Sequence, residues 1–389
     1  MNIAVDARWI FREISGIGNY TRQLLREFAR MPSDHRIIAL FNDPEIEART
    51  RAECALADAA HMRTLCIPWG VFDWRSQVFL PRLLAREHIR VFHSPNYMIP
   101  YRAFRRDALG PLRAVTTIHD LIPLRFPDHA PKSKKARLMP LFRLLLRESA
   151  RRSACILTVS NRSRQDIIEL LHAPSSRVKV VYNGVSGLFS PGMDGSDSAK
   201  RGDGGFRLLY VGRADPYKNI AVLLQALARL RHDAGMNVTL CIAGSPDPRY
   251  PGPAALAGEL GIAEAVRWTG YLPDDALVDL YRQSDLLVHP SRYEGFGLQI
   301  LEAMACGTPV LSSNAGSLPE VVGDAGRMVP PDDVEAFVRE IRTILTTPAL
   351  ARRMSEAGRV QAALFTWAEA ARQTYEAYLQ TDAMPEGSR

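Results

Sequence analysis

The sequence predicts an α/β protein made of two Rossmann-like, doubly wound domains that face a cleft. The chain has 389 residues, which exceeds one ordinary core and suits two domains of about 150–200 residues. Both halves alternate short runs rich in Val, Ile and Leu with helical patterns, as parallel sheets covered on both faces require. Between the halves, residues 190–205 are rich in Gly, Ser and Asp and lack apolar periodicity, so they predict a linker.

The first domain is expected over residues 1–189. Its strands are expected at 2–6, 36–41, 63–67, 91–93, 114–118, 156–160 and 178–181, and its helices near 18–30, 74–88, 134–152 and 162–171. The second domain is expected over residues 206–366. Its strands are expected at 207–213, 238–244, 266–270, 285–290 and 309–313, with helices between them. Ligands of such sheets bind beyond the carboxyl ends of the strands, so the chemistry is expected there.

Composition excludes several classes of protein. Hydrophobic residues make up 47% and charged residues 23% of the chain, as in an ordinary globular protein. No apolar run approaches the roughly 18 residues of a membrane helix, and the first residues lack the features of a signal peptide. We therefore expect a cytoplasmic protein. The five cysteines have no C-x-x-C spacing, which favours reduced thiols and predicts no metal site.

The basic charge of the chain is concentrated in one segment. The net charge is +7, and ten Lys or Arg residues but one acid, Glu148, lie between positions 132 and 164. Apolar residues alternate with them, which is typical of a basic amphipathic helix on an anionic membrane surface. A core-facing helix with a solvated basic face fits the pattern equally well. The membrane contact is expected at Lys132, Lys134, Lys135 and Arg137, which would place the protein at the inner face of the plasma membrane. No nucleic-acid partner is predicted.

Glycines follow the first strand of the first domain. Gly16 and Gly18 precede a helix in the sequence SGIGNY, although the last glycine of G-x-G-x-x-G is replaced by Thr21. Two such glycines let the backbone approach a phosphate or a sugar, and a helix N-terminus favours negative charge. A plain turn between strand and helix explains the pattern about as well. A dinucleotide oxidoreductase is disfavoured, because the complete glycine motif is missing.

The second domain carries a pair of cations at its first strand end. Gly212 and Arg213 close this strand, and Lys218 opens the next helix. An arginine and a lysine five residues apart on either side of a turn can bind one diphosphate from two sides. Two unrelated surface cations are the alternative.

Two acids lie around a helix start later in the second domain. Glu294 stands in a loop, and Glu302 lies a little over one turn into a helix that is expected to begin near Leu298, after Gly297. This arrangement directs carboxylates at sugar hydroxyls and free helix N–H groups at a phosphate. Taken alone, Glu294 could equally be a helix cap.

These motifs together resemble family 4 of the retaining glycosyltransferases, which have the GT-B fold. The resemblance rests on Gly-Arg-x4-Lys, Glu-x7-Glu in EGFGLQILE, EAMACGTPV and the glycine before Pro319, in this order. It implies that Arg213 and Lys218 neutralise the departing nucleotide diphosphate. It implies further that Glu294 holds hydroxyls of the donor sugar, that Glu302 holds the ribose, and that amides around Gly297 and Leu298 hold phosphate.

The resemblance also assigns a role in the first domain. His119, at the end of a strand in TTIHDL, matches the family histidine beside the transferred sugar. The helix near 367–380 would return to the first domain. The family transfers its sugar with retention, and fixed cations stabilise the leaving group without a metal ion or a cofactor. A non-catalytic nucleotide-sugar-binding protein on this fold is the alternative from another class.

The donor and the acceptor are predicted less directly. The segment HDLIPLRFPD resembles mannosyltransferases of bacterial O-antigen and related polysaccharides, which favours GDP-mannose. UDP-glucose and UDP-N-acetylglucosamine stay open, because base selection depends on loop atoms such as those near Leu272. A glycan or lipid-linked acceptor is expected on the side of the first domain. The aromatic cluster in IPWGVFDW either stacks on that acceptor or packs in the core. The acceptor-side candidates are Trp69, Trp74, Asn96 and Tyr97.

Overall fold

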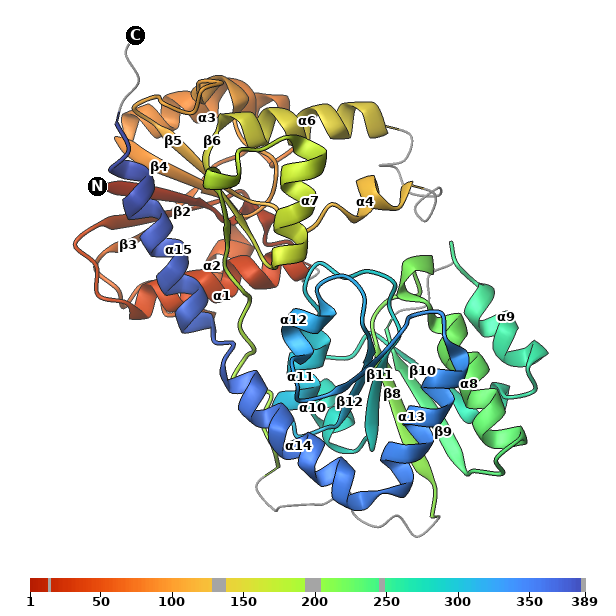
Figure 1. Ribbon diagram of the computed structural model, residues 1–389. Helices are drawn as coiled ribbons and strands as arrows, with labels where there is room; N and C mark the ends of the chain where they lie inside the picture. Colours follow the sequence, from red (N-terminus) through yellow and green to blue (C-terminus); the bar gives the residue numbers. More distant parts are fainter. Residues whose placement is uncertain (13–14, 128–137, 193–203, 245–248, 386–389) are drawn as a thin grey trace. The chain divides into compact units, whose positions relative to one another are not determined.

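The computed structural model describes the chain apart from residues 13–14, 128–137, 193–203, 245–248 and 386–389 (Figure 1). The chain forms two compact units. Unit 1 comprises Met1–Leu124, Arg137–Gly184 and Trp367–Arg389, and unit 2 comprises Arg125–Ala136 and Val185–Thr366. Each unit contains its own parallel sheet, so the predicted fold class is confirmed.

The sheet of unit 1 has seven parallel strands in the order β3-β2-β1-β4-β5-β6-β7. The strands are β1 (Asn2–Asp6), β2 (Arg36–Phe41), β3 (Met62–Cys66), β4 (Ile89–Ser94), β5 (Arg113–Thr117), β6 (Ser153–Thr158) and β7 (Val178–Val180). The helices are α1 (Gly16–Arg30), α2 (Pro44–Glu53), α3 (Trp74–Arg86), α4 (Ile122–Arg125), α6 (Met139–Arg152), α7 (Asn161–Leu171) and α15 (Trp367–Asp382).

Alternate side chains of β1 enter different layers of the core. Ile3 and Val5 belong to the cluster that α1 and α15 cover, whereas Ala4 packs in the cluster that contains α3. Successive strand residues point to opposite faces, so a strand buried on both sides must be apolar throughout. This explains why the strands read as continuous apolar runs.

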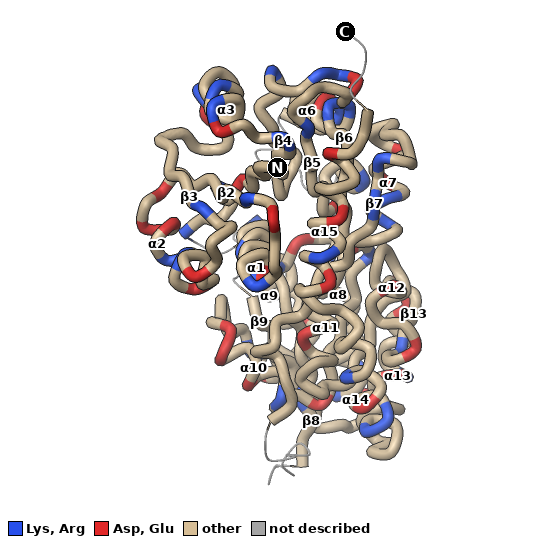
Figure 2. The backbone as a smooth tube through the Cα atoms, turned by 90° about the vertical axis from the view of Figure 1, so that its left-hand side faces the viewer, with Lys and Arg blue, Asp and Glu red and all other residues tan. Residues whose placement is uncertain are grey.

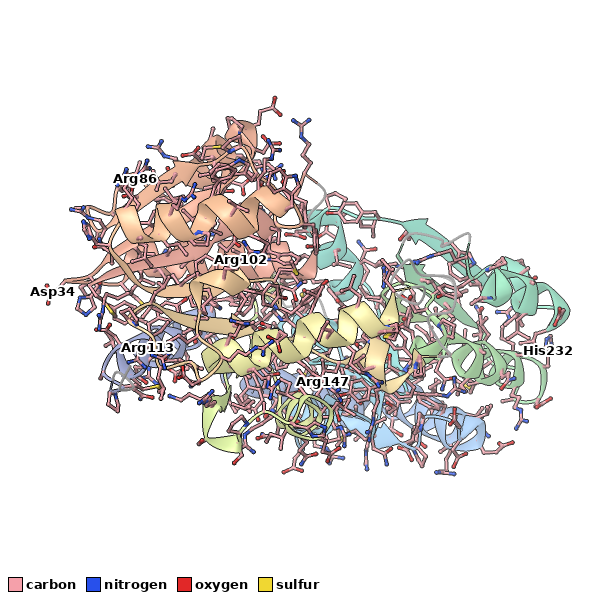
Figure 3. The ribbon with its side chains drawn as sticks, turned by 90° about the horizontal axis from the view of Figure 1, so that it is seen from above. Asp34, Arg86, Arg102, Arg113, Arg147 and His232 are labelled. Carbon is pink, nitrogen blue, oxygen red and sulfur yellow. The ribbon has the colours of Figure 1, made fainter. Side chains whose placement is uncertain are left out.

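The C-terminal helix α15 is fixed to the sheet of unit 1 at its far end. Arg113, which is labelled in Figure 3, lies at the start of β5 and is 1% exposed. Its Nη2 donates to the carbonyl oxygens of Met384 and Pro385 at 2.7 and 3.1 Å. A buried guanidinium needs such acceptors, because an unpaired charge is strongly unfavourable inside a protein. The segment after α15 is therefore attached to the strand on which α15 packs.

The sheet of unit 2 has six parallel strands in the order β10-β9-β8-β11-β12-β13. The strands are β8 (Phe206–Val211), β9 (Val238–Ala243), β10 (Val266–Gly270), β11 (Leu286–His289), β12 (Val310–Ser313) and β13 (Arg327–Val329). The helices are α8 (Ile220–His232), α9 (Gly252–Glu259), α10 (Asp274–Arg282), α11 (Leu298–Ala305), α12 (Leu318–Val322), α13 (Val334–Thr346) and α14 (Pro348–Ala363). Leucines of α8 and apolar residues of α13 share one core cluster with β8, β9 and β11.

The strands that the sequence predicted are present, with small differences at their ends. The largest shift is in β6, which begins at Ser153 rather than at 156. Its first residue is polar, but the Ser153 hydroxyl lies 2.6 Å from that of Thr116, and this pairing satisfies both groups inside the sheet. Several elements were missed, among them α2, α4 and β13. α2 buries only Ile46 and Thr50, so its periodicity is weak, and β13 is three residues long.

Candidate active site

The strand order reverses at one point in each sheet. In unit 1 this point lies between β1 and β4, and in unit 2 between β8 and β11. In open α/β sheets, ligands usually bind at such a point, where the loops after the two central strands diverge. The functional side chains are therefore expected in the loops that follow these strands.

Glycines shape the carboxyl edge of the sheet in unit 2. A Cβ on Gly244, directly after β9, would lie 2.0 Å from the carbonyl oxygen of Gly212, directly after β8. The latter glycine has a φ of +144°, which side chains rarely allow. The two loops can approach this closely only because Gly244 lacks a Cβ. Gly212 was predicted as a binding residue, whereas Gly244 was not singled out.

Lys218 lies in the loop between β8 and α8, in a 3-10 turn of Pro216–Lys218. Its Nζ donates to both carboxylate oxygens of Glu294, at 2.7 and 2.8 Å. The next residue, Asn219, has a φ of +58°, and its amide donates to the backbone oxygens of Pro290 and Pro331. Both residues thus hold this turn in place, and the Lys218 side chain connects the loop after β8 to the loop after β11.

Glu294 is the centre of a buried polar cluster. Its Oε1 accepts from Lys218, from Nε2 of His289 at 2.8 Å and from the Ser291 hydroxyl at 2.7 Å. Burial alone would raise the pKa of this carboxyl. The Lys218 charge and the His289 hydrogen bond outweigh burial, so its pKa lies well below the usual range. The site therefore holds a fixed carboxylate, 6% exposed, before any ligand arrives.

Sequence reasoning missed the partners of this carboxylate. His289 ends β11, is fully buried and stacks against Tyr210 at 5.9 Å. The hydroxyl of Ser317 donates to the backbone oxygens of Glu294 and Phe296 at 3.0 Å each and so holds their loop. A polar residue at the end of an otherwise apolar strand, such as His289, was the available signal.

Arg213 differs from Lys218 in its surroundings. Its side chain is 62% exposed and pairs with Asp215 at 3.0 Å. The two cations of the predicted pair are therefore present in one loop but are not equivalent. Lys218 is held by a buried partner, whereas Arg213 is free to reorient toward a ligand because an exposed pair is held weakly.

The helix start that the sequence predicted lies where expected. α11 begins at Leu298, and Gly297 precedes it with a φ of +103° and no side chain that caps the helix. A Cβ on Gly297 would lie 2.8 Å from a methyl group of Leu318. The first turn of α11 thus presents backbone N–H groups that an anion can use.

Glu302 lies in α11 in a different environment from Glu294. Its Oε2 accepts from the hydroxyl of Tyr281 at 2.8 Å. Burial raises the pKa of Glu302 to about 7, and the Tyr281 hydrogen bond opposes this only in part. No cation is among the causes, so the ionised form lacks the support that Glu294 has. Its predicted partners, ribose hydroxyls, would supply hydrogen bonds to that form.

In unit 1 the structure holds His119 directly after β5. Its Nε2 bonds to the carbonyl oxygen of Pro95 at 3.0 Å, and its own carbonyl accepts from the Ser163 hydroxyl at 2.9 Å. A carbonyl only accepts, so Nε2 carries the proton and Nδ1 keeps its lone pair. Burial lowers the pKa of His119 to about 4, so this imidazole is neutral near pH 7.

The glycine pair in unit 1 is less open than predicted. Gly18 N–H donates to the Ser15 hydroxyl at 3.1 Å, which caps α1. The amide of Gly18 is therefore already used, whereas a Cβ on Gly16 would meet no atom within 4 Å. Space for a ligand at this turn is thus found beside Gly16.

The remaining predicted residues have varied surroundings. Trp74 is 69% exposed, whereas Trp69 is half-buried and stacks on Phe79 at 5.4 Å. The half-buried Tyr97 packs against Phe142, and the Asn96 side chain accepts from the Tyr97 N–H. Leu272 is also half-buried, in the loop after β10. Of the first-domain aromatic cluster, only part lies in the core.

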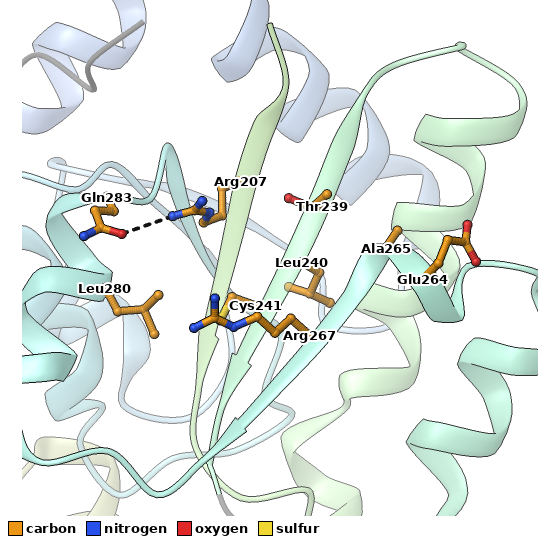
Figure 4. A pocket seen from close by; sticks show the side chains of 9 residues that line it. All are labelled: Arg207, Thr239, Leu240, Cys241, Glu264, Ala265, Arg267, Leu280 and Gln283. Carbon is orange, nitrogen blue, oxygen red and sulfur yellow. Dashed lines mark hydrogen bonds between the residues drawn. The ribbon is translucent and has the colours of Figure 1, made fainter. Parts of the chain in front are cut away.

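Two hollows of unit 2 lie at the amino ends of its strands, away from the glycine-rich edge. The smaller, of about 200 Å³, is lined near the starts of β8, β9 and β10 by Arg207, Thr239 and Arg267 among others (Figure 4). The larger, of about 570 Å³, includes Phe206, Asp285 and Pro309. Neither adjoins the Lys218–Glu294 cluster. Within the described ranges, no three His, Cys, Asp or Glu side chains are grouped to hold a metal ion.

Solved structures share this architecture. A sucrose-phosphate synthase from Thermosynechococcus elongatus superposes with a TM-score of 0.74 at 22% identity, over 97% of this chain and 98% of its own. Anabaena HepE, in complex with UDP and glucose, superposes with a TM-score of 0.73 at 18% identity, over 98% of this chain and 100% of its own. The two sheets thus have the GT-B fold of glycosyltransferases.

Sequence comparison identifies the family. Residues 14–186 match the model of Glycosyltransferase Family 4, and residues 196–361 match that of Glycosyl transferases group 1. O-antigen chain mannosyltransferase B of Escherichia coli is 32% identical over 382 residues, which are 94% of this chain and 96% of the relative. The chain belongs to the family 4 glycosyltransferases, as the motifs predicted.

Proposed function

We propose that this glycosyltransferase moves mannose from GDP-mannose, with retention and without a metal ion, onto a glycan or lipid-linked acceptor of a cell-surface polysaccharide. The single observation that carries the proposal is the buried Lys218–Glu294 pair at the switch point of unit 2. The full-length similarity to an O-antigen mannosyltransferase supports the choice of sugar.

The charges of the site suit the departure of a diphosphate. Cleavage of the bond from C1 to the phosphate oxygen leaves positive charge on the sugar ring and an additional negative charge on the diphosphate. Arg213 and Lys218 are cations in the same loop, and the first turn of α11 offers N–H groups. Such fixed groups stabilise developing charge without reorganisation, which is why no metal is required in this proposal.

The acceptor hydroxyl would then attack C1 from the side that the diphosphate leaves. Its proton passes to the departing phosphate oxygen, so the configuration at C1 is retained and no enzyme carboxylate becomes glycosylated. Glu294 already accepts hydrogen bonds from three side chains, and its loop is held by Ser317. These contacts support a role in holding sugar hydroxyls rather than in attacking C1.

A UDP-sugar donor is the second candidate within the same chemistry. The structural neighbour HepE is in complex with UDP and glucose, at 18% identity. A non-catalytic nucleotide-sugar-binding protein is the candidate from another class. It would share the donor site but would not transfer the sugar.

The test is incubation of the protein with GDP-mannose, UDP-glucose and UDP-N-acetylglucosamine, each with a lipid-linked or free glycan acceptor and excess EDTA. We expect mannose transfer, with the α-linkage of the donor retained in the product by NMR. Transfer only from a UDP-sugar would replace the donor assignment. Binding without transfer or hydrolysis would favour the non-catalytic candidate, and an absolute requirement for Mn²⁺ or Mg²⁺ would contradict the mechanism.

We also propose that unit 1 associates with an anionic membrane through α6. The predicted residues Lys132, Lys134, Lys135 and Arg137 lie outside the described residues. Basic residues recur along the adjacent described helix, α6 (Figure 2). Leu138, Leu141 and Leu144 are 58%, 49% and 55% exposed, and the side chain of Arg151 is 66% exposed. Such a surface combines apolar insertion with attraction to anionic lipid.

No helix in the described part of the chain is long and apolar enough to cross a membrane. Binding should therefore be peripheral and salt-sensitive, at about 1 kcal/mol for each basic residue near the lipid. We expect co-sedimentation with anionic but not zwitterionic vesicles. Replacement of the four basic residues by Gln should abolish it, whereas Leu364→Gln, an exposed apolar site of unit 2, should not. Absence of binding at low salt would refute the proposal.

A further inference from the structure

A chain of buried hydrogen bonds connects the C-terminal helix to the neighbourhood of His119. The Tyr378 hydroxyl lies 2.6 Å from Nδ1 of His93, and Nε2 of His93 lies 2.8 Å from the Thr117 hydroxyl. The Thr117 hydroxyl lies 3.1 Å from that of Tyr20. All four side chains are at most 3% exposed. The chain therefore joins α15, β4, β5 and α1, which are far apart in the sequence.

Every polar group in this chain of hydrogen bonds has a partner only if each side chain keeps its own proton. A neutral imidazole donates from one ring nitrogen and accepts at the other, so His93 can join Tyr378 to Thr117 in either direction. Burial, and then the nearby His119, lower the pKa of His93 to about 3, and burial raises the pKa of Tyr20 to about 12. All members are thus neutral near pH 7, which suits a rigid support rather than a route for protons.

The end of this chain contacts His119 itself. The rings of Tyr20 and His119 form a T-shaped pair, with centroids 4.8 Å apart and planes at 90°. Trp367, the first residue of α15, contacts Tyr20 in turn at 6.0 Å. α15 therefore reaches this neighbourhood twice, through Trp367 at its start and through Tyr378 near its end. The Pro95 carbonyl fixes one atom of the His119 ring, and Tyr20 fixes the plane of that ring.

We propose that Tyr20, His93 and Tyr378 are positioning residues, through which the docking of α15 on unit 1 orients the His119 imidazole for sugar transfer. The proposal rests on the proposed function and on the family resemblance that places His119 beside the transferred sugar. A ring held by one hydrogen bond can still tilt about it, and a misplacement of about 1 Å at a reacting centre can lower a rate about 100-fold. The chain of hydrogen bonds from Tyr378 to Tyr20 prevents the His119 ring from tilting and does not itself touch the substrate.

The decisive variant is Tyr378→Phe, because this hydroxyl does not contact His119. We expect kcat to fall about tenfold while the Kd for GDP, which unit 2 binds, stays unchanged. Tyr375→Phe is the matched control. It removes a hydroxyl from the same helix. This hydroxyl lies 2.6 Å from that of Ser33 and is not part of the hydrogen-bonded chain from Tyr378 to Tyr20. Its kcat should equal that of the wild type. Tyr20→Leu should lower kcat further, and Tyr20→Phe, which keeps the ring, should restore part of the loss.

A second measurement does not depend on activity. NMR of the histidine rings, with His119→Gln for assignment, reports the surroundings of the His119 ring through its ¹H and ¹⁵N chemical shifts. We expect the Nε2–H form in every variant, because the Pro95 carbonyl selects it. The ring shifts of His119 should change in Tyr378→Phe and Tyr20→Leu, because the Tyr20 ring no longer holds the same plane against it, and should stay as in the wild type in Tyr375→Phe. Equal kcat in the Tyr378→Phe and Tyr375→Phe variants, or unchanged His119 ring shifts in Tyr378→Phe, would overturn the proposal. Absence of transfer by the wild type with a normal NMR result would instead count against the proposed function alone.

Discussion

Replacement of Lys218 by Met should destabilise unit 2 as well as abolish transfer. The lysine is 8% exposed, and its removal leaves Glu294 buried with the hydrogen bonds from His289 and Ser291 but without the Lys218 charge. Breaking one partner of a buried ion pair destabilises a protein by about 3–5 kcal/mol, because the other charge loses its compensation. An exposed pair would contribute at most about 1 kcal/mol.

The size of this effect should depend on pH. Without Lys218 the pKa of Glu294 rises, because burial is then less opposed. Lower pH protonates the carboxyl and removes the uncompensated charge, so the variant should recover toward wild-type stability between pH 7 and pH 5. The wild type changes in the opposite sense, since its depressed pKa gives stability that is lost only as the pH falls below the usual range of a carboxyl.

Hydrogen exchange of peptides from β11 and β12, followed by mass spectrometry, reports the opening of unit 2 alone. Arg213→Met is the control. Its exposed side chain predicts a stability change within about 0.5 kcal/mol, together with weaker donor binding. The double variant Lys218→Met/Glu294→Gln should regain most of the lost stability but no activity. Exchange in Lys218→Met equal to that in Arg213→Met would refute the structural role of the pair.

Three further predictions follow from single features. Gly244→Ala should destabilise unit 2 by about 1–3 kcal/mol, because the new Cβ would lie 2.0 Å from a backbone oxygen. Gly252→Ala, whose Cβ would meet no atom within 4 Å, should leave the exchange of unit 2 unchanged in the same assay. Donor affinity measured by calorimetry should rise roughly tenfold from pH 6 to pH 8. The reason is that Glu302, whose pKa burial raises to about 7, must be ionised to accept hydrogen bonds from the ribose hydroxyls. Glu302→Gln should remove most of this pH dependence. The free energy of unfolding of unit 1 should fall by about 2 kcal/mol for each of His93 and His119 at pH 5. Burial lowers the pKa of both histidines in the folded state below the ordinary 6.5, so stability is lost as the pH falls. Unchanged hydrogen exchange of β4 and β5 at pH 5 would contradict this.

Periodicity in the sequence predicted the fold well, because buried parallel strands must be apolar along their whole length. It failed where burial was slight or where polar groups paired inside the sheet. α2 buries two residues, and β6 starts with a serine that bonds to Thr116 across the strands. Neither the contact nor the shallow burial has a signal in a single sequence.

The candidate site residues were predicted from motifs, but the contacts between them were not predictable. The sequence suggested that Arg213 and Lys218 act alike, whereas the structure gives Lys218 a buried partner and leaves Arg213 exposed. This difference depends on the meeting of two loops that are 76 residues apart. For the same reason His93 and Tyr378, which are 285 residues apart, gave no sign of their contact.

The most direct test of the account is the binding of nucleoside diphosphates to three forms of the protein: wild type, Arg213→Ala and Arg267→Ala. Arg213 follows β8 at the glycine-rich edge, whereas Arg267 lines the hollow at the amino ends of the strands. Calorimetry in the presence of EDTA should show GDP binding to the wild type and to Arg267→Ala with equal affinity. Arg213→Ala should bind at least tenfold more weakly, since it lacks a charge-assisted contact. Equal GDP affinity of the Arg213→Ala variant and the wild type, or loss of binding in Arg267→Ala alone, would contradict the donor site proposed at the switch point of unit 2.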